Sequence, residues 1–149
     1  MKRALDFLNN HVEIAFATCE GDRPRIRIFQ MMKMEGTTLY FATSPVKEVF
    51  RQLHNNPFVE IMASESKEFV KVSGKANFDV DVETQKWIYE HNPVLPRLYT
   101  SFYKMAYFKV EIEEMDHYDF EPTPPMFKHL NLNDNTVNDG YVGERYSKK

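Results

Sequence analysis

Short runs of β-forming residues, separated by turn residues, are the feature that most limits how this chain can fold. Each run is rich in β-branched or aromatic side chains, and Gly, Pro, Asn or charged clusters follow it. Parallel strands need a long crossover connection between them, whereas several of these runs are joined by short turns. The pattern therefore predicts an antiparallel barrel with minor helices. Six strands are expected: Val12–Thr18, Arg25–Lys33, Thr38–Thr43, Phe58–Ala63, Phe69–Phe78 and Ala106–Met115.

Three short helices are predicted beside these strands, at Lys2–Asn10, after Ser44, and at Asp81–His91. Apolar residues recur in them at helical spacing. The second begins at Ser44-Pro45, because Ser44 can accept a hydrogen bond from an early backbone amide and Pro45 has no N–H that needs a partner.

The periodic pattern covers residues 1–120, a length that suits one domain with its own core. From Glu121 onward it gives way to Pro-Thr-Pro-Pro and an Asn- and Asp-rich segment. Residues 121–149 are therefore expected to be irregular, or to pack on a partner surface. Within the domain, Gly74 interrupts the apolar face of its strand, which indicates a bulge, a bend or the close approach of another group.

Composition narrows the classes of partner. The 149 residues include 19 Lys and Arg against 22 Asp and Glu, a net charge of −3, so a dedicated nucleic-acid binder is not expected. No run approaches the roughly 18 apolar residues of a membrane span, and the N-terminus lacks a secretion signal. The single Cys19 excludes an internal disulfide and a cysteine-based zinc site. We expect a cytoplasmic protein whose partners are small molecules or other protein chains.

One group of residues has the chemistry of a phosphate site. Arg25 and Arg27 lie two positions apart on one strand, and Thr43, Ser44 and Lys47 lie where a strand meets a helix. Hydroxyl, guanidinium and ammonium groups beside a helix N-terminus suit an anion. The same residues also fit an ordinary cap beside a solvated strand face, and the pattern alone favours that interpretation slightly.

The remaining polar residues suggest no catalytic centre. The five histidines have neither metalloprotease nor zinc-finger spacing, so no metal site is expected. Cys19 has no neighbouring base, and Glu111, Glu113 and Glu114 fit the wet face of a strand. No side chain is assigned as a catalytic acid or base.

The stretch from Phe7 to Phe78 resembles the pyridoxamine 5′-phosphate oxidase-like flavoproteins, a family of FMN-binding split barrels. The matching pieces are FLNNHVEIAFAT, GDRPRIRIFQ, LYFATSPVKEVFRQLHNNPFVEI and EFVKVSGKANF, in the family's order. The last strand, AYFKVEIEEM, fits the same plan more loosely. The resemblance implies a mainly β fold, a six-stranded antiparallel split β-barrel (Greek key) with a few short helices. Residues 1–120 would then be an FMN-binding split-barrel domain.

The resemblance also implies a homodimer with FMN at the interface, and a role for ten residues. Arg27 and Lys47 would hold the FMN phosphate, with Arg25 as a second guanidinium. Phe29 and Gln30 would bring strand backbone to the isoalloxazine edge, and Phe69 would reach the flavin, if necessary from the other subunit. The ribityl and phosphate end would be lined by Phe41, Ala42, Thr43 and Ser44.

True pyridoxamine phosphate oxidases end in an Arg- and His-containing segment that holds the substrate. The C-terminal region here has no such motif, which argues against vitamin B6 oxidation. The leading hypothesis is an FMN-dependent oxidoreductase that links NAD(P)H to a small oxidised substrate. The alternatives are a non-catalytic flavin-binding or redox-sensing module and, less favoured because the histidines are scattered, a barrel that holds haem.

Overall fold

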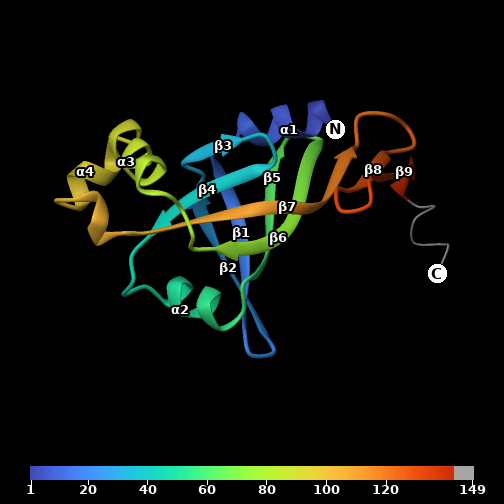
Figure 1. Ribbon diagram of the computed structural model, residues 1–149. Coiled ribbons are helices and arrows are strands. Elements are labelled where there is room, and N and C mark those ends of the chain that lie inside the picture. The colour runs from blue at the N-terminus through green and yellow to red at the C-terminus, as the bar shows by residue number, and fades with distance from the viewer. Residues whose placement is uncertain (143–149) are drawn as a thin grey trace.

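The computed structural model describes residues 1–142, in which nine strands form one curved antiparallel sheet (Figure 1). The strands are β1 (Glu13–Glu20), β2 (Arg23–Gln30), β3 (Lys33–Glu35), β4 (Thr38–Thr43), β5 (Phe58–Glu65), β6 (Glu68–Asn77), β7 (Ala106–Asp119), β8 (Met126–Asn131) and β9 (Thr136–Tyr141). The main order across the sheet is β2-β1-β5-β6-β7-β4-β3, and β8 and β9 continue it beside β7. The predicted mainly β, antiparallel split-barrel fold is confirmed.

The predicted strand Arg25–Lys33 is divided in the structure, which corrects the sequence-based expectation. β2 ends at Gln30, after which the Met31 N–H donates to the Val12 carbonyl (2.6 Å) and the Met32 N–H donates to the Tyr40 carbonyl (2.9 Å). The chain thus leaves β1 and joins β4 within two residues, and β3 continues along β4. This crossing connects the two ends of the sheet.

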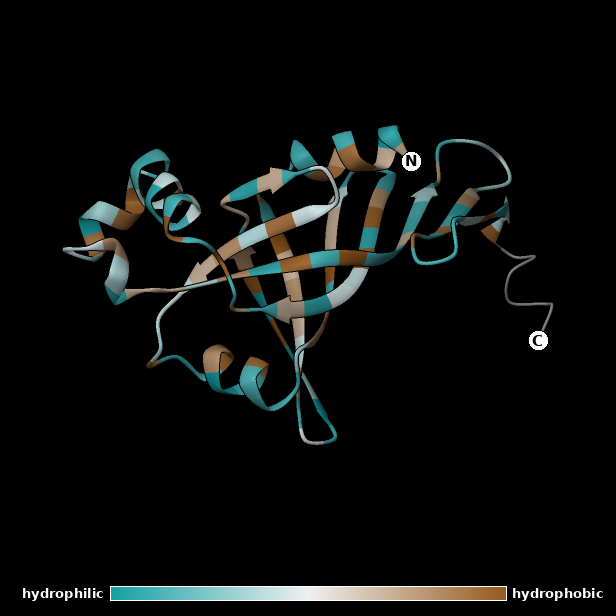
Figure 2. Cartoon of the chain, in the orientation of Figure 1, coloured by the Kyte–Doolittle hydropathy of each residue, from teal (hydrophilic) through white to brown (hydrophobic). Residues whose placement is uncertain are grey.

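Side chains at alternate strand positions fill the interior of the curved sheet, and apolar stretches recur along the strands in Figure 2. The rings of Phe16, Phe29, Phe41 and Phe108 meet there, with centroids between 5.0 and 6.0 Å apart. Each such contact contributes about 0.5–1.5 kcal/mol beyond the burial of its area. Because the four rings come from β1, β2, β4 and β7, they join both halves of the sheet.

The helical segments are α1 (Lys2–Asn9), α2 (Glu48–Asn55), α3 (Val82–His91), α4 (Val94–Leu98) and the 3₁₀ turn η1 (Phe102–Lys104). α1 buries Ala4 and Leu8 against the main core. The segment from α3 to η1 forms an excursion between β6 and β7, to the left in Figure 1, around a second apolar cluster. No helix in the described part of the chain is long and apolar enough to cross a membrane.

The segment after Glu121 is more ordered than expected. β8 pairs with the far half of β7, and β9 pairs with β8. Leu130 of β8 is buried in the main core, and Asp116 of β7 contacts His129 of β8 and Lys71 of β6. The expectation of an irregular segment is therefore wrong for Met126–Tyr141, and residues 143–149 of the predicted tail lie outside the described residues. Packing of this segment on a partner stays a prediction.

The irregularity predicted at Gly74 is confirmed. The register between β6 and β7 shifts between Ser73 and Gly74. A Cβ atom at Gly74 would lie 2.2 Å from the Glu111 backbone oxygen and 2.8 Å from Val110 Cγ1, distances that real Cβ contacts do not reach. Glycine is therefore required here by the close approach of β7, not by its φ angle.

Candidate functional site

Arg27 is held by neutral acceptors at the junction of β1, β2 and α2. Its Nη1 donates to the Phe16 carbonyl (3.2 Å) and to Thr18 Oγ1 (2.9 Å), and its Nη2 donates to Gln52 Oε1 (2.8 Å). Partial burial lowers the pKa of the guanidinium below its ordinary value. Within residues 1–142, Arg27 makes no ion pair. A partly desolvated charge without a counter-ion is unfavourable, so this site suits an anion.

Arg25 lies on the same strand but is paired with a carboxylate. Its Nε and Nη2 donate to Glu20 Oε1 at 3.2 and 2.9 Å. Arg51 of α2 donates to Glu20 Oε2 at 2.5 Å and also contacts Glu48. Hydrogen bonds from Arg51, and then from Arg25, lower the pKa of Glu20 to about 2. The two arginines do not converge on one point here, and a role for Arg25 at a phosphate stays a prediction.

The end of β4 carries an unsatisfied hydroxyl. Phe41, Ala42, Thr43 and Ser44 are all buried, and the ring of Phe41 lies within the phenylalanine cluster of the core. Thr43 Oγ1 has no hydrogen-bond partner among the described residues. Leaving a buried hydroxyl unpaired costs about 1–3 kcal/mol. A ligand oxygen at the end of β4 would satisfy it.

The predicted helix start at Ser44 is three residues too early. α2 begins at Glu48 with Lys47 in the capping position, while Ser44 Oγ accepts a longer hydrogen bond of 3.4 Å from the Val46 N–H within the preceding turn. The Lys47 N–H donates to the Ser44 carbonyl at 3.0 Å, which closes that turn. The exposed Lys47 ammonium has neither an ion pair nor a hydrogen bond to any described residue. It is therefore available to an anion without breaking an existing contact.

The residues predicted at the flavin ring lie on two faces of the sheet. Phe29 packs inward against Phe16, whereas Gln30 is exposed at the end of β2. Phe69 stacks on Tyr118 with a centroid distance of 4.5 Å, and β1 and β5 separate its strand from β2. Phe69 therefore does not meet Arg27 within one chain.

The outer face of β2, β1 and β5 is unusually apolar for an exposed surface. Ile26 and Ile28 are 72% and 69% exposed, and the register places them beside Ala17 and Ala15. Met62 of β5 continues the row, because it pairs with Ala15. We call these five residues the outer apolar face. Isolated exposed apolar residues are ordinary, but a contiguous set marks an interaction surface.

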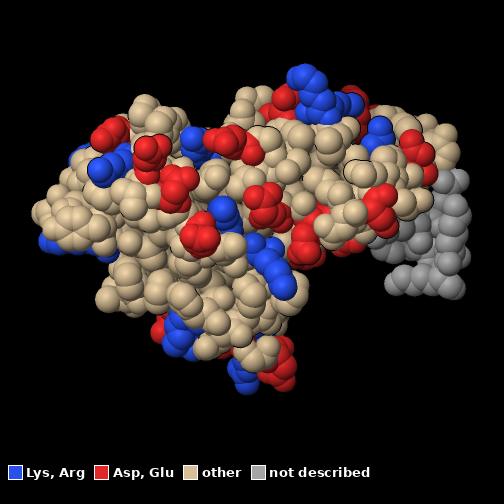
Figure 3. Space-filling model, in the orientation of Figure 1, with Lys and Arg blue, Asp and Glu red and all other residues tan. Residues whose placement is uncertain are grey.

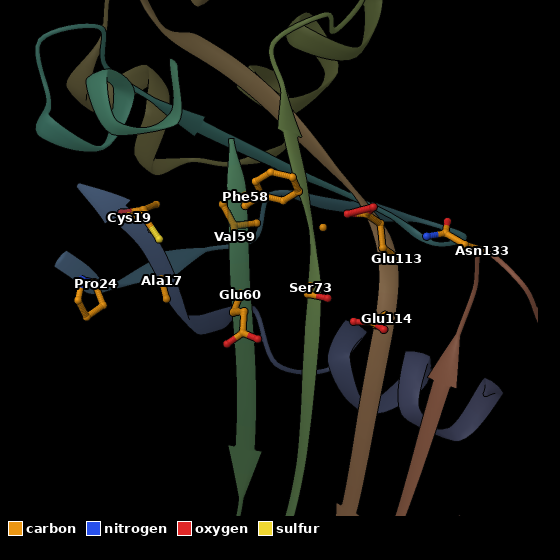
Figure 4. A pocket seen from close by; sticks show the side chains of 12 residues that line it. Ala17, Cys19, Pro24, Phe58, Val59, Glu60, Ser73, Glu113, Glu114 and Asn133 are labelled. Atoms are coloured by element: carbon orange, nitrogen blue, oxygen red, sulfur yellow. The ribbon is translucent and has the colours of Figure 1, made fainter. Parts of the chain in front are cut away.

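A cavity of about 500 Å³ adjoins the outer apolar face (Figure 4). Cys19 and Phe58 are among the residues that line it, and Glu60, Ser73 and Glu114 come from the neighbouring strands β5, β6 and β7.

On the face of the described residues that Figure 3 shows, acidic and basic side chains are interspersed, so a single sign of charge does not dominate there.

Three of the five histidines, His11, His117 and His129, contact carboxylates, whereas His54 and His91 stack on aromatic rings. His117 Nε2 contacts Glu68 Oε2 at 2.5 Å, and His11 Nε2 contacts Glu65 Oε2 at 3.1 Å. Within residues 1–142, no three His, Cys, Asp or Glu side chains gather in a group that could hold a metal ion.

Sequence reasoning missed Gln52 and Thr18, although both left a signal. Gln52 follows Val49 by three residues, on the buried side of α2, and Thr18 continues the inward positions of Ile14 and Phe16 on β1. A polar residue at an apolar position of a periodic pattern indicates a buried hydrogen bond. Here the two side chains bond to each other and to Arg27.

Comparison with known proteins identifies relatives over most of the chain. A model of the family described as pyridoxamine 5′-phosphate oxidase matches residues 1–117. A NimC/NimA family protein from Clostridium acetobutylicum is 26% identical, with a TM-score of 0.66, over 94% of this chain and 92% of that one. No curated protein matches the sequence.

Two further solved structures share the fold at lower identity. One is a pyridoxamine 5′-phosphate oxidase-related, FMN-binding protein from Nostoc punctiforme, with 13% identity and a TM-score of 0.68 over 95% of this chain and 93% of that chain. The other is PhzG from Burkholderia lata in complex with tetrahydrophenazine-1-carboxylic acid, with 15% identity and a TM-score of 0.65 over 95% of this chain and 89% of that chain.

Proposed function

Because the chain belongs to the pyridoxamine 5′-phosphate oxidase family, we propose that it binds FMN and acts as an oxidoreductase. In this proposal, NAD(P)H supplies the electrons and a small oxidised molecule accepts them. The observation that carries the proposal is the guanidinium of Arg27, which is partly buried, held in place and, within the described residues, without a counter-ion.

The residues near Arg27 fit the phosphate end of FMN. Arg27 would donate to the phosphate oxygens, and the ammonium of Lys47 would add a second charge from the turn before α2. Thr43 would donate its unpaired hydroxyl to the ligand, with Ser44 beside it. Charge-assisted hydrogen bonds of this kind contribute about 1.5–3 kcal/mol each.

Bound FMN supplies the hydride and electron transfer, and the protein supplies binding, orientation and electrostatics. No catalytic acid or base is therefore required among the side chains. Phe29 and Gln30 would present the end of β2 to the isoalloxazine edge. Phe41 and Ala42 would contribute through their backbone, since the Phe41 ring is buried in the core.

A homodimer through the outer apolar face completes the proposal. Burial of exposed isoleucine and methionine side chains favours association at about 25 cal/mol per Å². Gln30 and Phe69 occur at outward positions of their strands, opposite to the core. A second copy on this face would let Phe69 of one chain approach a flavin bound by the other, which a single chain does not allow.

The relatives suggest the class of substrate. The Burkholderia structure is in complex with tetrahydrophenazine-1-carboxylic acid, a fused-ring molecule with a carboxylate. We propose a ring-containing substrate for this chain as well, in its oxidised, quinone-like form. Vitamin B6 oxidation is not part of this proposal. The cytoplasmic location also remains a proposal.

The visible spectrum of the purified protein tests FMN binding directly. We expect flavin absorption at a concentration close to that of the protein. Colourless protein that takes up no added FMN would contradict the proposal, and a Soret band would indicate haem instead.

Turnover separates the enzyme from a passive flavin-binding or redox-sensing module. Oxidation of NADH and NADPH is followed with quinone, nitroaromatic and free flavin acceptors. We expect turnover with at least one acceptor. Flavin that is bound but never reduced by either nucleotide would favour the non-catalytic alternative.

A further inference from the structure

Gln52 occupies a position in α2 to which the sequence pattern assigns no role. Its side chain is only 4% exposed, and its Oε1 accepts two hydrogen bonds, from Thr18 Oγ1 (2.6 Å) and from Arg27 Nη2 (2.8 Å). Thr18 is 2% exposed and accepts from Arg27 Nη1 (2.9 Å). The two buried side chains and the guanidinium thus form a closed triangle of hydrogen bonds.

All acceptors of Arg27 in the described residues are neutral. They are a backbone carbonyl, a hydroxyl and a carboxamide. The neighbouring Arg25 and Arg51 differ, because both are paired with the carboxylate of Glu20. Neutral acceptors fix the direction of a guanidinium without cancelling its charge. Arg27 therefore keeps its positive field for an anion from outside the chain.

The Arg27 guanidinium has N–H donors left for such an anion. A guanidinium has five N–H donors in a rigid planar fork. Arg27 uses three of them on Phe16, Thr18 and Gln52, so two remain without an acceptor among residues 1–142. Two donors suffice for the paired contact that a phosphate group makes with arginine.

We propose that Gln52 is a positioning residue that, together with Thr18, aims Arg27 at the FMN phosphate and, being uncharged, leaves that arginine free to bind it. This inference rests on the proposed function. It predicts that the charge at position 52 sets the preference for FMN over riboflavin, the same flavin without its phosphate. A loss of fold stability would weaken the binding of both ligands alike. A change in the orientation or the net charge of the Arg27 site would weaken the binding of FMN only.

The decisive variant is Gln52→Glu, which keeps the shape of the side chain and pairs Arg27 with a carboxylate. The dissociation constants of FMN and riboflavin are measured by flavin fluorescence titration for the wild type and the variant. We expect the ratio of riboflavin to FMN constants to fall at least tenfold in Gln52→Glu, with riboflavin binding nearly unchanged. Asn55→Asp, which adds the same charge to an exposed position of α2, should keep the wild-type ratio.

A second variant, Gln52→Met, removes the acceptor without adding a charge, and we expect a ratio reduced about threefold to tenfold. If Gln52→Glu does not fold, as judged by thermal unfolding, Gln52→Met decides the question. An unchanged ratio in every folded variant at position 52 would overturn the inference while leaving FMN binding intact. A wild type that binds FMN no better than riboflavin would instead overturn the proposed phosphate site itself.

Discussion

At the scale of single residues, cationic side chains that look equivalent in the sequence have different partners in the structure. Arg25, Arg27, Lys47 and Arg51 are all cationic, but two of them are paired with Glu20 and two have no carboxylate partner among the described residues. Alternation along β2 predicts that Arg25 and Arg27 share a face. It cannot predict which of them forms an ion pair with Glu20, because that depends on where α2 places Arg51.

The proposed phosphate contacts of Arg27 and Lys47 give the first prediction. Combined replacement Arg27→Ala and Lys47→Ala should weaken FMN binding by well over tenfold, because each contact contributes about 1.5–3 kcal/mol. Fluorescence titration with FMN measures the effect, and riboflavin serves as the control ligand. Equal affinity for FMN before and after the double replacement would place the phosphate elsewhere.

Glu20 gives a prediction on pH. Its pKa in the folded protein is lowered from 4.5 to about 2, so its contacts with Arg51 and Arg25 stabilise the fold fully above pH 4.5 and lose that contribution as pH falls toward 2. The stability difference between wild type and Glu20→Gln should be constant near neutral pH and shrink between pH 4.5 and 2. Urea unfolding at several pH values measures it. A difference that grows in acid would contradict the sign.

At the scale of elements, the close approach of β6 and β7 fixes Gly74. Gly74→Ala would place a methyl group 2.2 Å from the Glu111 backbone oxygen, within a paired ladder that cannot easily yield. We expect a loss of about 1–3 kcal/mol of unfolding free energy, measured by urea denaturation. Ser73→Ala, on the outward side of the same bulge, is the matched control and should change little.

The β8–β9 hairpin gives a second prediction at this scale. Leu130 is 6% exposed and belongs to the main core, so Leu130→Ala should lower the unfolding free energy by about 2–5 kcal/mol. Val137 of β9 is 56% exposed, and Val137→Ala should stay within about 0.5 kcal/mol of the wild type. Equal, small effects at both sites would mean that the hairpin does not contribute to the core.

At the scale of the whole molecule, the inner and outer sides of the sheet have different roles. The inner side of the sheet holds the phenylalanine cluster and supports Arg27, whereas the outer side presents Ile26 and Ile28 to solvent. A single chain therefore carries the proposed phosphate site on one side of β2 and an unburied apolar row on the other. Association through that row would bring a second chain to the flavin end of β2.

Association through the outer apolar face can be tested by mutation. Ile26→Glu together with Ile28→Glu should give monomers in sedimentation velocity runs, because four buried charges would meet across the two-fold interface. FMN binding should weaken in the same variant. Val137→Glu, at an apolar position of β9 that is 56% exposed, should leave both properties unchanged. A dimer that survives the double replacement would place the interface on another surface.

The sequence by itself indicated the antiparallel class and most of the strands up to Met115, because period-2 alternation and turn residues are local signals. It also singled out a candidate set of phosphate-binding residues, which stays a prediction. It also carried the polar anomalies at Gln52 and Thr18. Only the tertiary structure decided that β2 ends before Met31, that α2 starts at Glu48, and that Met126–Tyr141 forms a hairpin on β7. The end of β2 and the hairpin depend on hydrogen bonds between strands, and the start of α2 depends on the turn that the Lys47 N–H closes on the Ser44 carbonyl. The same holds for Arg27: Thr18, 9 residues away, meets it through the pairing of β1 with β2, and Gln52, 25 residues away, meets it only because α2 folds against β1.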